Sequence, residues 1–425
     1  MTAERGGGER TASGGQCPVM AGAGVAETYD PFNASQVADP FSVWAAARAT
    51  SPVFFSPILE SWVVTQASLV KQVLQDPTTF KSGNADRSRP LPEAVSGLLA
   101  EKLSDGVTAL RATDGPQHQL RRRAVQTAIS SKRLSDMEPG FRAIANELID
   151  TFRDAGACEL YGAFAYPYPL RVISRLLGFA DDTAEDLHRW ANSRVSLWWG
   201  DLTLQQQLRA AEDLVEFYAF LREEVARRRV SPGEDLISLL LAQNDDADRP
   251  LTTAELVEAA SGLVVAGHES TANWLTQMVF YLLRQGRWSE AHGAAANRVV
   301  EESLRFDGPV MGVFRRAAAD ASVGDARIAT GDRVFCALSS ANRDEGLFDE
   351  PDQLVLDRPD ASRHLAFGNG VHTCVGAAIA RLEGRIALEA LHDRLPGLRL
   401  LTDDLEFAPN LSLRMPQALR LGWDR

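Results

Sequence analysis

The sequence predicts a mainly α protein with small β-sheets, folded as a single large domain. Helical periodicity occupies most of the chain after residue 134, and runs rich in β-branched and aromatic residues are short and few. No interior linker divides the 425 residues into two parts. A hydrophobic content of 45% and a charged content of 24% are those of a globular protein with a substantial core.

The N-terminal segment differs from the rest of the chain. It is rich in Gly, Ser and charge, and it lacks the apolar stretch of a secretory signal. We therefore expect a flexible N-terminal tail over residues 1–25, a folded domain over residues 26–425, and a cytoplasmic protein. Within the domain, the stretches VFFSP (53–57) and SWVVT (61–65) predict a pair of β-strands, because β-branched and aromatic residues favour strands.

Amphipathic helices follow. Between residues 134 and 230 several stretches with helical spacing are separated by Gly, Pro and Asp clusters. The strongest periodic signal runs from Thr252 to Arg284. Thr252 and Glu255 have the spacing of a capping box, and Gly286 is a stop signal. The sequence therefore predicts one unusually long helix over this range.

Short strands and a last helix complete the chain. Between residues 319 and 340, short β-prone runs alternate with turn residues. A final helix is predicted from about residue 375 to residue 394.

Charge and cysteine content exclude several classes of protein. A formal charge of -13 is unfavourable for binding nucleic acid, because that association depends on Lys and Arg neutralising phosphates. No apolar run is long enough to cross a membrane. The four cysteines, Cys17, Cys158, Cys336 and Cys374, lie far apart, which argues against a disulfide framework or a structural zinc site.

The first unusual segment, AGHEST (266–271), lies inside the predicted long helix. Gly267 costs a helix interior about 1 kcal/mol relative to Ala. One explanation is a kinked helix in which Ser270 or Thr271 donates back to a carbonyl one turn earlier. The other is that Gly267 admits a flat group beside the backbone while Glu269 and Ser270 handle protons. The segment alone does not decide between them.

The second segment is EESLRF (301–306). Glu302 and Arg305 are three residues apart on a helix, so their side chains share a face and can pair. This pattern is common in helical proteins and identifies no function on its own.

The third segment, FGNGVHTCVG (367–376), places a cysteine in a glycine-spaced loop before a helix. Gly368 and Gly370 allow a tight turn that aims amide hydrogens at one point. A helix N-terminus near Cys374 favours a negatively charged sulfur. The pattern predicts a buried, hydrogen-bonded thiolate, and thiolate is one of the protein ligands of haem iron. The alternative is a buried free cysteine that acts as a small hydrophobic residue.

Together these motifs resemble the bacterial soluble cytochromes P450, from about residue 28 to the end of the chain. FGNGVHTCVG fits the haem-loop pattern of that family at every fixed position. AGHEST is similar to its oxygen-activating segment, EESLR to its E-x-x-R pair, and ANRDEGLF to its approach to the haem loop. The order and spacing of the four motifs also agree. The resemblance implies the cytochrome P450 fold, with haem between the long central helix and the helix after the cysteine loop.

The resemblance also implies a set of residues around haem b, which is iron protoporphyrin IX. Cys374 would be the axial ligand of the iron, with Phe367 and Gly368 beside the sulfur and Ala266 and Gly267 against the other face. Four residues would bind the haem propionates, since Arg and His pair well with carboxylates: His118, Arg122, Arg315 and His372. Glu302 and Arg305 would be a structural pair with no part in the chemistry.

The activity implied is that of a haem-thiolate monooxygenase. It would insert one oxygen atom of O2 into a small, largely apolar substrate by hydroxylation or epoxidation, as in natural-product tailoring. Glu269 and Ser270 would guide protons. The substrate pocket would be lined by residues of three segments: Leu263, Val264, Met311, Val313 and Leu411.

The electron source is expected to lie outside the chain. No nucleotide fingerprint or ferredoxin-type cysteine run occurs in the sequence, so electrons from NAD(P)H would arrive through a ferredoxin reductase and a ferredoxin. We expect a monomer that binds neither nucleic acid nor a membrane.

One position departs from the family pattern, which usually has Thr after the acid, whereas this chain has Ser270 after Glu269. A serine hydroxyl can still relay a proton, but its rotamer is less fixed without the methyl group. Leakage of reduced oxygen as peroxide is the consequence we expect.

Three alternatives remain open at this point. One is a peroxide-driven or non-hydroxylating haem-thiolate oxidase, and another is a non-catalytic haem sensor. The third is a hydrolase that uses Cys374 and His372 as nucleophile and base. The identity of the substrate does not follow from the sequence.

Overall fold

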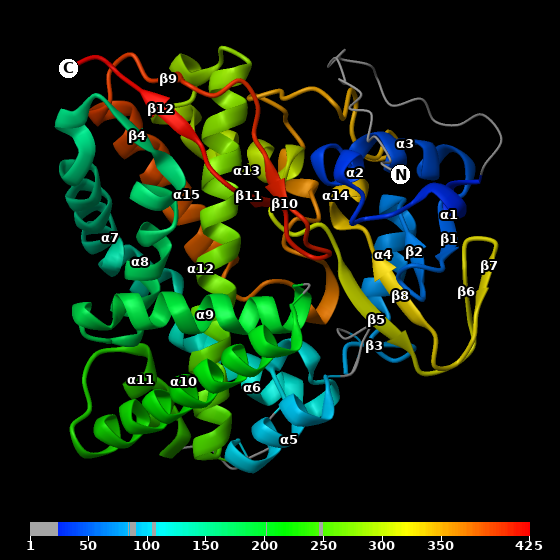
Figure 1. Ribbon diagram of the computed structural model, residues 1–425, viewed down its shortest axis with the longest axis horizontal. Coiled ribbons are helices and arrows are strands. Elements are labelled where there is room, and N and C mark those ends of the chain that lie inside the picture. Colours follow the sequence, from blue (N-terminus) through cyan, green and yellow to red (C-terminus); the bar gives the residue numbers. More distant parts are fainter. Residues whose placement is uncertain (1–23, 84, 86–90, 104–107, 201, 246–249) are drawn as a thin grey trace, which may run out of the picture.

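The computed structural model describes residues 24–83, 85, 91–103, 108–200, 202–245 and 250–425 (Figure 1). Its α-helices are α1 Val25–Thr28, α2 Ala34–Ala38, α3 Phe41–Thr50, α4 Ala67–Gln75, α5 Glu93–Lys102, α6 Gly115–Ala128, α7 Ser131–Phe152, α8 Pro167–Leu177, α9 Ala184–Trp199, α10 Leu204–Val230, α11 Leu236–Asp245, α12 Thr253–Arg284, α13 Ala296–Phe306, α14 Leu338–Ala341 and α15 Ala377–Arg394. Its strands are β1 Val53–Ser56, β2 Ser61–Val64, β3 Phe80–Lys81, β4 Ala157–Glu159, β5 Val313–Ala317, β6 Ala321–Val323, β7 Ala326–Ile328, β8 Arg333–Cys336, β9 Arg399–Leu400, β10 Phe407–Ala408, β11 Met415–Pro416 and β12 Arg420–Gly422. The predicted mainly α fold with small sheets is confirmed.

Helix α12 is the central element and runs the height of the molecule in Figure 1. It has 32 residues and begins with the predicted capping box, in which Thr252 accepts from the Glu255 amide and Glu255 accepts from the Thr252 amide. The helix ends before Gly286, whose φ of 66° is a left-handed conformation that glycine adopts without strain. Both predicted boundaries of the long helix are therefore confirmed.

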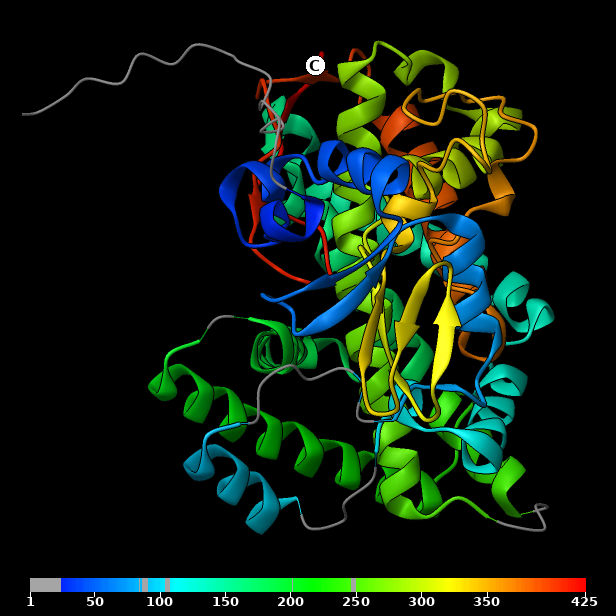
Figure 2. The same cartoon turned by 90° about the vertical axis from the view of Figure 1, so that its right-hand side faces the viewer.

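The largest sheet lies to one side of the helices, and Figure 2 shows the broad face of this sheet. Its strand order is β1-β2-β8-β5-β3. Strands β1 and β2 form the antiparallel pair expected from VFFSP and SWVVT, while β8 pairs in parallel with β2 and antiparallel with β5. Because β5 and β8 lie inside this sheet, with a paired strand on each side, Arg315 on β5 has a fixed position relative to the helices.

The helical core is one apolar cluster that draws on helices from α6 to α15. Helix α15 packs closely on α12: a Cβ atom at Gly384 would lie 2.1 Å from the Trp274 ring. Trp274 also donates from its indole to Ser303 of α13 at 3.0 Å. The glycine therefore allows α15, which follows the cysteine loop, to lie against the long helix. Helices α5, α9 and α10 share a smaller apolar cluster of their own.

The N-terminal boundary differs slightly from the prediction. Most of the expected tail lies outside the described residues. Val25, which we expected to be its last residue, is instead buried at the start of α1 and packs in the cluster that contains Trp44. No helix in the described part of the chain has the length and apolar character needed to span a bilayer.

Candidate active site

The cysteine loop is held by its glycines and by backbone hydrogen bonds. Gly370 has a φ of 75°, and a Cβ atom there would lie 2.2 Å from the Leu74 carbonyl oxygen, so only glycine fits. Gly368 also has a positive φ, of 71°. The Cys374 amide donates to the Phe367 carbonyl at 2.9 Å, which closes the loop. The loop therefore fixes Cys374 just before Gly376, the N-cap of α15.

Cys374 as a residue is exposed, and the buried thiolate that the sequence predicts stays a prediction. Even so, desolvation by the surrounding chain raises the pKa of its thiol. The amides of Gly376 and Ala377 and the cations of Arg122 and Arg381 oppose this shift by favouring the thiolate. Coordination of a metal ion is a means of deprotonating such a thiol outright.

Phe367 links the loop to helix α13. The guanidinium group of Arg381 lies over the Phe367 ring, 4.5 Å from its centroid, which is a cation–π distance. Arg381 also pairs with Glu301 of α13 through two hydrogen bonds, at 2.5 and 3.0 Å. The Phe367 ring is therefore held in place by Arg381 of α15, which is itself held by Glu301 of α13.

Four basic side chains from three parts of the chain gather near the loop. His118 and Arg122 lie one turn apart on α6, Arg315 lies on β5, and His372 lies in the short helix η8 (Gly370–His372). The rings of His118 and His372 are in contact, with centroids 4.0 Å apart. Oδ1 of Asp114 is 3.6 Å from Nε2 of His372.

The charged forms of these four groups repel one another, and the surrounding protein shields them from solvent. Burial lowers the pKa of each of them. Arg122 and Arg315 lower the pKa of His118 further, and Arg315 does the same to His372, while Asp114 acts in the opposite direction on both histidines. A ligand with two carboxylate groups would stabilise all four cationic forms. The cysteine and these four basic residues thus fit haem, which would offer an iron for the thiolate and two propionates for the cations.

The middle of α12 presents a different surface. Ala266 is exposed, whereas Gly267 faces α8, where a Cβ atom would meet only Ile173 at an ordinary 3.5 Å. Ser270 donates back to the Ala266 carbonyl at 2.8 Å, which is the helix back-bond that we considered for this segment. Gly267 therefore shows no close backbone approach within the described part of the protein.

Glu269 is buried beside these residues. Its Oε2 has no hydrogen-bond partner among the described residues. Desolvation raises the pKa of this carboxyl group to about 7. It can therefore gain or lose a proton near neutral pH, as a general acid or base must.

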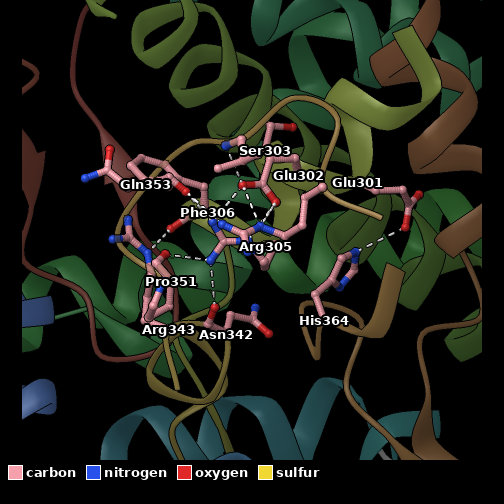
Figure 3. Close-up of polar contacts among 12 residues, drawn as sticks. Glu301, Glu302, Ser303, Arg305, Phe306, Asn342, Arg343, Pro351, Gln353 and His364 are labelled. Carbon is pink, nitrogen blue, oxygen red and sulfur yellow. Dashed lines mark hydrogen bonds and ion pairs between the residues drawn. The ribbon is translucent and has the colours of Figure 1, made fainter. Parts of the chain in front are cut away.

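Glu302 and Arg305 form the pair that their spacing predicted, at the centre of the network in Figure 3. Both side chains are inaccessible to solvent, and Arg305 donates twice to Glu302, at 2.7 Å in each case. The remaining donors of Arg305 satisfy the carbonyls of Asn342, Pro351 and Gln353. The pair thus holds the segment that leads to the cysteine loop against α13.

Sequence reasoning missed one partner in this network. Arg358 donates from Nε to both oxygens of Glu302, at 3.1 and 3.2 Å. An arginine 56 residues away, in a stretch with no regular spacing, carries no local signal of this contact. Arg381, which lies over Phe367 of the cysteine loop, was missed for the same reason.

The five predicted pocket residues do not form one apolar cluster. Leu263 and Val264 belong to the helical core, and Val264 is wholly buried. Met311 and Leu411 pack in the cluster that contains Trp44, and Val313 is half-buried at the start of β5. Their contact with substrate stays a prediction.

Comparison with known proteins agrees with this geometry. The Cytochrome P450 family model matches residues 295–394. The chain is 34% identical over 367 residues to cytochrome P450 107B1 of Saccharopolyspora erythraea. This alignment covers 84% of this chain and 87% of the relative. It is 33% identical over 377 residues to the mycinamicin IV hydroxylase/epoxidase of Micromonospora griseorubida, covering 86% and 90%.

Solved structures show the same likeness. The P450 heme domain of Tepidiphilus thermophilus superposes with a TM-score of 0.89 at 30% identity, covering 94% of this chain and 97% of that chain. Relatives with similar identity include a cyclomarin C epoxidase of Salinispora arenicola and a cytochrome P450 monooxygenase of Streptomyces venezuelae. The chain therefore belongs to the cytochrome P450 family and is a haem-dependent monooxygenase of the bacterial type.

Proposed function

We propose that the Cys374 sulfur would hold the haem iron and that the enzyme inserts one oxygen atom of O2 into a small, largely apolar substrate. The observation that carries this assignment is the environment of the sulfur. The thiol is desolvated, and two amides and two guanidinium groups favour its charged form. Bound haem supplies the reductive activation of O2 and the transfer of oxygen to a C–H bond or double bond.

The chain's own residues bind and orient the cofactor. His118, Arg122, Arg315 and His372 hold the propionates, and this pairing relieves the repulsion among them. Phe367, held under Arg381, limits access to the sulfur.

Glu269 and Ser270 handle protons in this proposal. A carboxyl group with a pKa of about 7 releases and regains a proton without a large energetic cost at neutral pH. Ser270 is back-bonded to Ala266, so its hydroxyl must turn away from the helix to donate elsewhere. Glu269 therefore supplies the proton, and Ser270 directs it.

Electrons reach the enzyme from NAD(P)H through a ferredoxin reductase and a ferredoxin, and the enzyme works as a cytoplasmic monomer. A natural product of secondary metabolism is the substrate class favoured by relatives such as the mycinamicin IV hydroxylase/epoxidase.

The alternatives differ in what they require of the site. A hydrolase would need His372 as a base for Cys374, but the His372 ring packs on His118 and its Nε2 lies towards Asp114. A peroxide-driven oxidase or a haem sensor would not need a carboxyl group poised to exchange protons, which favours the O2-dependent reaction.

Consumption of O2 with a ferredoxin and its reductase tests the proposal. We expect O2 and NAD(P)H to be consumed in the presence of a bound ligand, with one oxygen atom of labelled O2 found in the product. Product formation with hydrogen peroxide alone would favour the peroxide-driven alternative. Haem binding without turnover in either assay would favour the sensor.

A further inference from the structure

Two of the predicted pocket residues, Met311 and Leu411, lie on segments that are hydrogen-bonded to each other. The Met311 amide donates to the Ser412 carbonyl at 2.8 Å, and the Arg414 amide donates to the Pro309 carbonyl at 2.8 Å. The side chains of Met311 and Leu411 also pack in one apolar cluster with the N-terminal helices α1 and α3. A shift of either segment would therefore move both side chains.

The main sheet fixes one side of these segments. A Cβ atom at Gly312 would lie 2.3 Å from the Phe335 ring and 2.7 Å from the Cys336 carbonyl oxygen, so the chain next to Met311 rests directly on β8. On the other side, β11 packs on α12 and β10 packs on α2, and Figure 1 shows these strands between the long helix and the N-terminal helices. The position of Leu411 therefore depends on what holds the C-terminal loop (410–414) in place.

Arg414 is the residue that holds this loop. Its side chain is buried and donates from Nε to both carboxylate oxygens of Asp307, at 3.2 Å in each case. Its other two nitrogens donate to the Val37 carbonyl at 2.6 Å and to the Ala38 carbonyl at 2.9 Å. The guanidinium group also lies 3.6 Å from the centroid of the Phe407 ring. One side chain thus joins the end of α13, α2 and β10 to the C-terminal loop.

Asp307 directly follows α13 and leads into the segment 309–313. Its side chain is inaccessible to solvent, and the Tyr281 hydroxyl of α12 donates to its Oδ2 at 2.8 Å. A buried carboxylate that loses its cation is strongly destabilising, so the two charges stay together in the folded protein. The planar fork of Arg414 donates in several fixed directions, which a Lys side chain does not reproduce. The pair therefore specifies one position for the two segments that it joins.

We propose that Arg414 and Asp307 are positioning residues for substrate selection. By fixing the C-terminal loop against the segment 309–313, they set how much room Met311 and Leu411 leave for the substrate. This inference rests on the proposed function and on the prediction that these two apolar side chains line its pocket. The charged side chains are themselves buried, so they act through the residues that they hold and not by contact with the substrate.

Binding of two imidazole ligands to the haem-loaded enzyme tests this role without turnover. Imidazole and 4-phenylimidazole both bind iron through a nitrogen atom, and only the second carries a phenyl group that reaches towards the pocket wall. The shift of the absorption band during titration gives each dissociation constant. The variants are Arg414→Lys, which keeps the charge but loses the fork, and Asp307→Asn, which keeps the shape. Leu411→Ala alters the predicted wall directly.

The matched control is Arg228→Lys. Arg228 is also buried, and it pairs with the carboxylates of Glu224 and Asp235. Its Nη2 nitrogen donates to the carbonyls of Leu177 and Gly178. The control therefore loses a guanidinium fork of the same kind, at the ends of α8 and α10.

We expect Arg414→Lys and Asp307→Asn each to weaken the binding of 4-phenylimidazole relative to imidazole by about tenfold, because small changes in a hydrophobic pocket have effects of this size. Leu411→Ala should change the same ratio, and Arg228→Lys should not. A native ratio in both pair variants would overturn the proposed role, whether or not Leu411→Ala changes it. An equal change in Arg228→Lys would also overturn it, since lost stability alone would then explain the effect. An enzyme with the expected ratios that oxidises no substrate would refute the proposed function and leave the role of the pair standing.

Discussion

Cys374 shows how position decides what a cysteine can do. Cys158 and Cys336 are also free, and burial raises the pKa of each thiol to about 12. A raised pKa disfavours the thiolate, which is the form that acts as a nucleophile or metal ligand. Cys374 is also desolvated, but amides and guanidinium groups surround its sulfur and favour the thiolate. The flanking glycines that allow this arrangement are visible in the sequence, whereas the position of Arg381 is not.

Ser270→Thr should reduce the leakage of peroxide. The added methyl group restricts the χ1 rotamers of the side chain, so its hydroxyl is held in fewer positions. We expect the ratio of peroxide released to O2 consumed to fall several-fold. Thr276→Ser is the matched control, because its hydroxyl makes the same back-bond, to Ala272 at 3.0 Å, in a buried position. Equal peroxide ratios in Ser270→Thr and the native enzyme would contradict the prediction.

Glu269→Gln should make the protein more stable at alkaline pH. The folded state raises the pKa of Glu269 from 4.5 to about 7, so it holds a proton that the unfolded chain releases. The free energy of unfolding therefore falls as pH rises from 4.5 to 7, and it stays lower above pH 7.

The neutral amide that replaces the Glu269 carboxyl group in this variant carries no such penalty. We expect the variant to gain about 1 to 3 kcal/mol over the native protein at alkaline pH and much less at acidic pH. Urea unfolding of both proteins at the two pH values measures this difference. A difference between the proteins that does not change with pH would refute the assigned pKa.

At the scale of elements, the sequence predicted the helix ends and strands that local residue patterns determine. The capping box at Thr252, the stop at Gly286 and the strands β1 and β2 follow from residues close together in the chain. The π-helical turn η3 (Tyr161–Ala165), which packs on α12, was not predicted, because YGAFA carries no local signal that distinguishes it from an ordinary helix. The gathering of Arg315 with α6 was predicted only through the family resemblance.

Glu302→Ala should destabilise the fold strongly. It removes the carboxylate that accepts from Arg305 and Arg358 and leaves both guanidinium groups buried. We expect a loss of about 3 to 5 kcal/mol in the free energy of unfolding, the usual cost of breaking a buried pair. Glu290→Ala breaks an exposed pair with Arg287 and should change stability little. Similar losses in the two variants would show that burial does not determine the effect.

Gly384→Ala tests the contact between α15 and α12. The new methyl group would lie 2.1 Å from the Trp274 ring, so one of the helices must move. We expect a loss of about 1 to 3 kcal/mol in the free energy of unfolding, typical of overpacking. Gly97→Ala on α5, where nothing lies within 4 Å of the new atom, should instead stabilise the protein by about 0.5 to 1 kcal/mol. Thermal unfolding of both variants decides whether the effects have opposite signs.

At the scale of the whole molecule, the fold brings together elements that are far apart in the chain. The proposed propionate site joins α6, β5 and η8. The order of four motifs in the sequence predicted this assembly through a known family. The pocket residues were the least predictable, because their side chains belong to separate apolar clusters.

The visible spectrum of the reduced enzyme with carbon monoxide tests the central claim most directly. A thiolate ligand on haem iron gives an absorption band at a characteristically long wavelength for such a complex. We predict this band in the native protein and in Cys158→Ala, and its loss in Cys374→Ala. A native protein without porphyrin absorption, or the same band in Cys374→Ala, would contradict the account.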